Sequence, residues 1–301
     1  MRKVLLKSIV FNKDNEGIIN GLKYIQHNFS VKNVKIGIVE QMEKETHFVK
    51  IFCDDKDYND RINVRFNFYL SITLYRIIAK QFLKFKLEAF IRDNYFFLKS
   101  SEVEDIKRMC KEAFIYEGKI KDENNVFYIN KRNIISKKIA KCLEEYLEIN
   151  VDGLTTFRTR QFEKYFFSIV DRVIEKYMAE KEYKEFIKLL KYFVEIQESK
   201  LDEINIYINK KGEYFIKDNI EFKEIAAIIH DNSYSKLRNE ASVEDIIISE
   251  LITIAPKKII IHGEDNCRNK EFLATIKSVF DNKVEICNNC DFCKDNNLVL
   301  T

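Results

Sequence analysis

The chain has 301 residues, of which 46% are hydrophobic and 13% aromatic, and this composition excludes a disordered protein. Its 51 basic and 48 acidic residues leave a net charge of +3. Over the whole chain this balance does not indicate a nucleic acid or an anionic membrane as a partner.

The first fifty residues predict a small α+β unit. Apolar and polar residues alternate, as in strands, over 4–11, 34–39 and 47–53. Apolar residues at helical spacing cover 17–28. One Pro and seven Gly in the whole chain predict long helices and few flexible linkers in the rest.

Helices are expected to follow. Residues 58–91 predict one long aromatic-rich helix, and a second helix over 101–114 begins with a capping-box pattern at Ser101 and Glu104. Residues 117–130 combine a glycine, a polar run and a short strand at 126–129. We therefore place a domain boundary there, dividing the chain into 1–116 and 117–301, although one single domain is also compatible with the pattern.

The next helices are expected over 131–148 and, after a turn at Asp152-Gly153, over 156–198. Apolar side chains at helical spacing mark two stripes on the second of these helices. One stripe consists of Phe162, Phe166, Ile169, Val173 and Tyr177, and the other of Phe186, Leu189, Leu190, Phe193 and Ile196.

The last hundred residues predict more strands. Residues 204–208 and 214–217 flank Lys210-Lys211-Gly212 and form an expected β-hairpin. A helix over 243–254 is followed by a strand at 258–262, a helix at 269–280 and a strand at 284–287, a spacing typical of a βαβ unit with parallel strands. The predicted fold class is therefore a helix-rich α+β or α/β protein.

Three segments together resemble the YtxC-like family of sporulation proteins. They are VDGLTTFRTRQF at 151–162, FIKLLKYFVEIQE at 186–198 with LDEI at 201–204, and LITIAPKKIIIHG at 251–263. The resemblance covers about residues 150–290. It implies a cytoplasmic protein of spore-forming Gram-positive bacteria, and it implies no particular reaction.

The N-terminus and the cysteines indicate the cellular compartment of the protein. The N-terminus lacks a secretory signal, and no stretch reaches the roughly 18 uncharged apolar residues of a membrane helix. The seven cysteines are an odd number in a large chain, which favours reduced thiols over a disulfide framework. The sequence therefore predicts a cytoplasmic protein that does not span a membrane.

Cys287, Cys290 and Cys293 form the sharpest chemical motif, with two residues between successive cysteines. Thiolates at this spacing can converge on one soft metal ion. In the predicted βαβ unit His262 and Cys287 end two parallel strands, so His262, or Cys267 in the following loop, is the expected fourth ligand. Zinc fits better than an iron–sulfur cluster, whose usual run continues to a fourth cysteine and a proline. Free or merely structural thiols without a metal are the interpretation that ranks above either metal.

Arg158 and Arg160 form a second candidate site. If Thr156 caps the helix, both arginines fall near its first turn, where the helix dipole disfavours cations. Such a placement predicts a phosphate, a carboxylate or a protein partner beside them, or else an ion pair within the chain.

These patterns leave three functions open. The leading hypothesis is a non-enzymatic scaffold or regulator of sporulation that acts through a protein partner, because no Gly-rich phosphate loop, HExxH or GxSxG motif is present. The second is a metal- or thiol-dependent enzyme or redox sensor that uses the C-terminal cysteines. The third is nucleic-acid binding through Arg158, Arg160 and nearby lysines.

Overall fold

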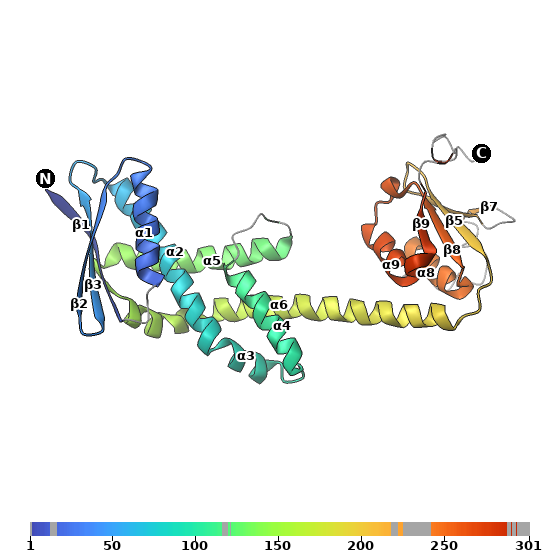
Figure 1. The fold of residues 1–301 in the computed structure, drawn as a ribbon, viewed down its shortest axis with the longest axis horizontal. Coiled ribbons are helices and arrows are strands. Elements are labelled where there is room, and N and C mark those ends of the chain that lie inside the picture. The colour runs from blue at the N-terminus through green and yellow to red at the C-terminus, as the bar shows by residue number, and fades with distance from the viewer. Residues whose placement is uncertain are drawn as a thin grey trace. The chain divides into compact units, whose positions relative to one another are not determined.

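The structure is a computed structural model in which the chain divides into two compact units, Met1–Met178 and Ala179–Thr301 (Figure 1). For a few residues, 155–159, 217 and 222–224, it describes the backbone alone. The residues that it describes are 2–12, 17–115, 120, 122–217, 222–224, 242–287, 290 and 293.

The first unit contains a four-stranded sheet in the order β2-β3-β1-β4. Strands β1 (Lys3–Asn12), β2 (Ile36–Glu43) and β3 (Thr46–Asp54) pair antiparallel, while β4 (Glu148–Asn150) pairs parallel with β1. Helix α1 (Gly17–Ser30) lies against this sheet (Figure 1). It buries one apolar stripe, as its helical spacing predicts, formed by Ile18, Leu22, Ile25 and Phe29.

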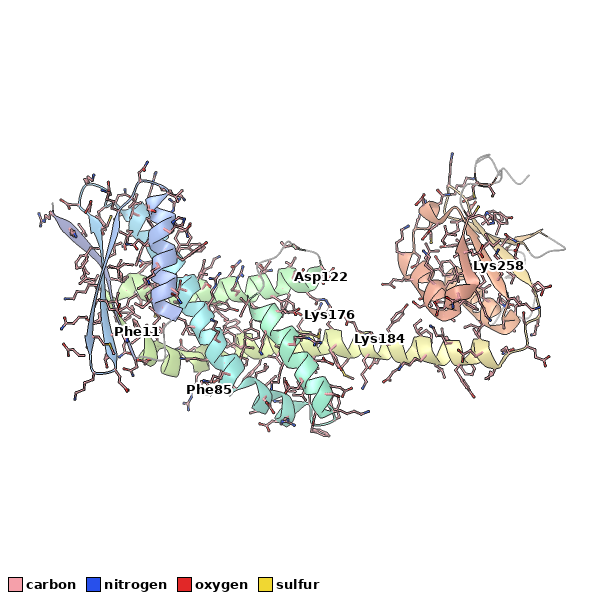
Figure 2. The ribbon with its side chains drawn as sticks, in the orientation of Figure 1. Phe11, Phe85, Asp122, Lys176, Lys184 and Lys258 are labelled. Atoms are coloured by element: carbon pink, nitrogen blue, oxygen red, sulfur yellow. The ribbon has the colours of Figure 1, made fainter. Side chains whose placement is uncertain are left out.

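Five helices complete the first unit. They are α2 (Asp60–Phe85), α3 (Leu87–Asn94), α4 (Ser100–Ile115), α5 (Glu123–Glu145) and the first part of α6 (Val151–Ile196). Their core contains a cluster of aromatic rings, in which the ring centroid of Phe82 lies 4.9 Å from that of Phe166 and 5.6 Å from that of Phe114. Asp122 caps α5 and forms an ion pair with Lys176 of α6 at 3.4 Å (Figure 2).

Two details of the predicted helices are wrong. The long helix expected over 58–91 is two helices, because α2 ends at Phe85 and α3 begins at Leu87. The strand expected at 126–129 lies inside α5, since the Asp122 cap starts the helix just before it and Tyr128 is buried on the helix face. The β-branched and aromatic residues of that segment therefore follow the helix that surrounds them rather than their local preference.

The two compact units do not meet at the expected boundary near residue 117. Helix α5 and the first part of α6 contribute Ile135, Ile139, Phe162 and Phe166 to the core of the first unit. The division by contacts falls at Met178 and Ala179, within the continuous helix α6. A single helix can thus supply side chains to two separate cores. Amino-acid composition along the chain does not reveal a boundary of this kind.

Lys7 ties the sheet of the first unit to α5. Its ammonium group is buried and donates hydrogen bonds to the main-chain oxygen of Leu143 and, at 2.8 Å, to that of Tyr146, at the end of α5. A cation at this position satisfies carbonyl groups that the helix leaves without partners. Burial lowers the pKa of Lys7, an effect that Glu144 opposes.

Replacing Lys7 by methionine is expected to lower the free energy of unfolding by about 1–3 kcal/mol, because buried carbonyl groups lose their donor. Urea unfolding followed by circular dichroism measures the change. The matched control is Lys50→Met on the exposed side of β3, which should stay within about 0.5 kcal/mol of wild type. Equal stability of the Lys7 and Lys50 variants would show that the cap contributes nothing.

The second unit contains a five-stranded sheet in the order β7-β6-β5-β8-β9. Strands β5 (Glu203–Ile208) and β6 (Tyr214–Lys217) form the predicted antiparallel hairpin, which β7 (Phe222–Glu224) extends. The other two strands, β8 (Lys258–His262) and β9 (Val284–Ile286), are parallel. They are connected through α9 (Lys270–Phe280) and two short 3-10 turns at Glu264–Asn266 and Asp281–Lys283. The predicted βαβ unit and the helix-rich α+β class are therefore confirmed.

A second core lies between this sheet, α8 (Val243–Ile254), α9 and the last turns of α6. The strand side chains that point into it alternate along β5 and β8, as in a sheet covered on one face. They are Ile204, Ile206, Ile208, Ile259 and Ile261. The intervening side chains point to the opposite face. Within the part of the chain that the structure describes, no helix is long and apolar enough to cross a membrane.

Candidate metal centre

The candidate site lies where two parallel strands end. His262 is the last residue of β8, and Cys287 directly follows β9. The Cys287 N–H donates a hydrogen bond of 2.9 Å to the main-chain oxygen of Ile261, which continues the strand pairing and holds the thiol beside the histidine. Carboxyl ends of parallel strands meet at one edge of a sheet, so the βαβ topology itself brings these two side chains together.

Cys290 and Cys293 complete a cluster with His262 and Cys287. The sulfur of Cys293 lies 3.7 Å from that of Cys290 and 3.7 Å from that of Cys287. The Nδ1 atom of His262 lies 3.4 Å from the sulfur of Cys290 and 3.6 Å from that of Cys293. All four potential ligand atoms lie within 4.8 Å of one another.

These separations match those around a single tetrahedral zinc ion. Bond lengths of about 2.3 Å to sulfur and about 2.05 Å to nitrogen at tetrahedral angles place two sulfurs about 3.8 Å apart and a sulfur about 3.6 Å from a nitrogen. The space inside the cluster therefore suits one ion. An iron–sulfur cluster needs room for several irons and sulfides between its ligands, which this spacing does not provide.

The hydrogen bonds of His262 fix which ring nitrogen faces the thiols. Asn205 uses its amide N–H to donate to Glu203 at 3.0 Å, so its side-chain oxygen is the atom that lies 3.0 Å from His262 Nε2. An oxygen accepts, and Nε2 must therefore carry the proton. This leaves the lone pair of Nδ1 directed at Cys290 and Cys293, the arrangement that a metal ligand requires.

The ring of His262 is also held by packing. It stacks on Tyr207 with 4.3 Å between ring centroids and an angle of 20° between planes. Tyr207 pairs with His262 across β5 and β8, and Asn205 lies two residues earlier on the same face of β5. Gly263 then takes a left-handed conformation with φ of 70°, where a Cβ would come within 2.3 Å of the Ile208 oxygen. A glycine is needed for the chain to turn away directly after the ligand.

Burial shifts the pKa values of the cluster toward uncharged side chains. Burial lowers the pKa of His262, so its ring is neutral and able to coordinate. Burial and the neighbouring thiols of Cys290 and Cys287 raise the pKa of Cys293 to about 12. A divalent ion reverses this preference, because its charge stabilises thiolates. The N–H of Cys290 points to the sulfur of Cys287 at 3.5 Å, which adds a weak hydrogen bond to that thiol.

Cys267 does not join the cluster. Its side chain is buried, donates to the main-chain oxygen of Asn269 at 3.2 Å and contacts the hydroxyl of Tyr214 at 3.5 Å. Of the two residues that the sequence offered as fourth ligand, the structure therefore places His262, and not Cys267, beside the three thiols.

The helix that carries Arg158 and Arg160 does not begin at Thr156, where the sequence predicted its cap. Helix α6 begins at Val151, and the side chain of Asn150 accepts the N–H of Gly153 at 2.9 Å as a cap. Both arginines therefore lie beyond the first turn, and Thr156 is not a cap. The side chain of Arg158 lies outside the described residues, while that of Arg160 is exposed. An anion or partner site at these residues stays a prediction.

Asn205 is the residue that sequence reasoning missed. It occupies an ordinary position in a strand, and it reaches His262 only because β5 pairs parallel with β8. The expected hairpin and the expected βαβ unit did not imply that pairing. A polar residue on the strand face that bears the ligand is the one sequence feature that could have suggested it.

Comparison with known proteins gives a consistent picture. The sequence model of the YtxC-like family matches residues 68–285. The chain is 23% identical over 217 residues to a Bacillus subtilis (strain 168) protein named "Uncharacterized protein YtxC". The aligned region covers 70% of this chain and 74% of that protein. No solved structure matches.

The family match ends just before Cys287, so the metal argument depends on the geometry of this chain alone. The match does include most of α2, all of α3 to α6 and most of the second unit, which is more than half of the sequence. It also includes the three segments whose residues resemble the family. The chain belongs to the YtxC-like family.

Proposed function

We propose that this chain is a zinc-binding protein whose second unit is stabilised by one ion held by His262, Cys287, Cys290 and Cys293. The observation that carries the proposal is the set of four ligand atoms at the separations of a tetrahedral site. The Asn205 hydrogen bond supports it, because it presents the correct nitrogen of His262.

The number of protein ligands favours a structural role for the ion. Catalytic zinc usually has three protein ligands and a water or substrate in the fourth position, whereas structural zinc has four protein ligands. Here the protein supplies four, three of them thiolates, which leaves no coordination position for a substrate. We therefore place the chain among accessory proteins that act through contacts, rather than among metal-dependent hydrolases.

The biological setting of the proposal comes from the family. The resemblance of the chain to that family supports a role as a scaffold or regulator of sporulation. We place the protein in the reducing cytoplasm, where cysteine thiols stay available for a metal. A protein partner fits this role, and the ion would keep the end of the second sheet in one conformation for such contacts.

Elemental analysis of protein purified without added metal tests the zinc site. The expected result is about one zinc per chain, lost on treatment with a strong chelator and accompanied by a lower thermal midpoint of the second unit. The full chain is used throughout, and a visible absorbance spectrum checks for iron. A folded, metal-free protein that also fails to bind added zinc would overturn the proposal. Stoichiometric iron would replace zinc as the metal.

A further inference from the structure

Charge is distributed unevenly between the two units. The first unit holds 33 basic and 25 acidic residues, a net of +8, and the second holds 18 basic and 23 acidic residues, a net of −5. The small net charge of the whole chain therefore conceals a basic unit and an acidic one. A basic unit attracts polyanions at long range.

Within the first unit the cations concentrate on two helices. From Arg61 to Lys86 the sequence contains six basic residues and no acidic one, nearly the full length of α2. From Val126 to Leu143, within α5, it contains five basic residues and no acidic one. These two helices pack against each other. Part of their cations, Arg76 of α2 and Arg132 and Lys137 of α5, share one region of the surface.

A cleft lies in this region, between α2, the end of α4 and α5. It has a volume of about 460 Å³, and basic side chains from both helices line it, namely Arg76, Arg132 and Lys137. A shallower depression beside it continues along α2 and is lined by Arg61, Val64 and Arg65, with Asp60 at its end. Phe68 lines both, so the two hollows are neighbours along α2, and together we call them the groove. From Arg61 to Arg76 the groove extends about 22 Å along the helix axis.

Apolar side chains line the groove together with the basic ones. Ile72, Phe114 and Ile115 line the cleft, and Phe68 stands between the two hollows with 53% of its surface exposed. Exposure on this scale leaves part of the ring available for stacking. Ser136 also lines the cleft, and its buried hydroxyl has no hydrogen-bond partner among the described residues. An incoming group with polar atoms could satisfy it.

We propose that this groove of α2 and α5 binds single-stranded nucleic acid. A groove lined by cations along one helix, with an aromatic ring between them, is the arrangement in which phosphates contact the rim and a base stacks on the ring. A small anion would occupy only the cleft and would not contact Arg61 and Arg65 in the shallower depression. A membrane surface is flat, whereas the basic side chains here surround a hollow.

Fluorescence anisotropy with labelled oligothymidylate of about 20 nucleotides tests the proposal on the full chain at low and moderate salt. The triple variant Arg76→Gln, Arg132→Gln, Lys137→Gln is expected to bind at least tenfold more weakly. Its dependence of log K on log salt should be shallower by about 2, since each phosphate contact on a single strand contributes about 0.7 to the slope.

The matched control removes three positive charges elsewhere in the same unit. Lys23→Gln, Lys32→Gln and Lys50→Gln lie at exposed positions on α1, the turn after it and β3. This control should bind within about twofold of wild type. Phe68→Ala, which keeps every charge and removes an exposed ring, should bind about five- to tenfold more weakly with an unchanged salt slope. It also keeps the test decisive if the triple variant misfolds.

Three results would overturn the proposal. The first is an absence of oligonucleotide binding to wild type at low salt. The second is a loss of affinity in the Lys23, Lys32, Lys50 control as large as that in the groove variant. The third is that wild type binds vesicles rich in phosphatidylglycerol but not the oligonucleotide, and that Phe68→Ala weakens the vesicle binding. That result would assign the groove to a membrane surface. Weaker binding by both groove variants, with the control unchanged, supports it.

Discussion

The Cys290→Ser protein is expected to purify without its zinc, whereas the Cys267→Ser protein keeps about one zinc per chain. Structural zinc sites contribute roughly 10–16 kcal/mol at neutral pH, so one of four ligands contributes about 3 kcal/mol and its loss weakens binding about a hundredfold or more. Cys267 is the matched control because it follows His262 in the loop after β8 and yet contacts Asn269 and Tyr214 instead of the cluster. Competition against a chromogenic chelator measures both affinities.

A graded series sharpens this test. Asn205→Ala removes the partner of His262 Nε2 and leaves all four ligands in place. It is expected to weaken zinc binding about 10- to 100-fold, less than the loss of a thiolate. If the Cys267 variant loses zinc while the Cys290 variant keeps it, the ligand set assigned from the geometry is wrong. Equal retention by all three variants would place the metal elsewhere in the chain.

Phe166→Ala is expected to lower the free energy of unfolding of the first unit by about 3–5 kcal/mol. Phe166 is fully buried, and its ring centroid lies 4.9 Å from that of Phe82 and 5.3 Å from that of Phe114. Removing the ring leaves a cavity where α2, α4 and α6 meet, and a core of aromatic rings cannot collapse easily to fill it. Urea unfolding monitored by far-ultraviolet circular dichroism measures the change.

The control for this variant is Phe85→Ala at the end of α2, where the side chain is 69% exposed (Figure 2). It changes the same residue type in a neighbouring helix and should stay within about 0.5 kcal/mol of wild type. A loss at Phe85 as large as that at Phe166 would mean that the exposed face of α2 is covered in solution. A negligible loss at Phe166 would contradict the packing of the three helices.

The fold could be predicted where local pattern and final environment agree. The hairpin and the βαβ unit of the second unit were predicted from alternation and spacing, and the stripe from Phe162 to Val173 on α6 is buried as expected. The second stripe on α6 is only partly right. Leu190 is buried together with Ile187 and Val194, but the other four members of the stripe are exposed, namely Phe186, Leu189, Phe193 and Ile196. Where a helix is apolar on several sides, periodicity does not identify the face that meets a neighbour.

Elements that depend on partners far along the chain could not be predicted. Strand β4 has three residues and is defined by pairing with β1, at the opposite end of the first unit's sequence. The strand expected at 126–129 is helical because of the Asp122 cap and of what α5 packs against. In both cases tertiary contacts, which a short segment does not reveal, decide the local structure.

The candidate site was predicted in outline and completed by the structure. The spacing of the three cysteines and the ends of two parallel strands pointed to the correct edge of the sheet. The choice between His262 and Cys267 needed coordinates, because both follow β8 within a few residues and differ only in where the loop directs them. The basic groove escaped prediction for another reason, since summing charge over both units hides their opposite signs.

Those opposite signs give the two units long-range electric fields of opposite sign. A net of +8 on the first compact unit and −5 on the second means that a polyanion attracts the first unit and repels the second before any contact forms. Zinc held by three thiolates, as proposed, adds one more negative charge to the acidic unit. The first unit, rather than the metal-bearing second unit, should therefore make the initial encounter with a polyanion. Moderate salt, which shortens the reach of the field to about 10 Å, should abolish this steering.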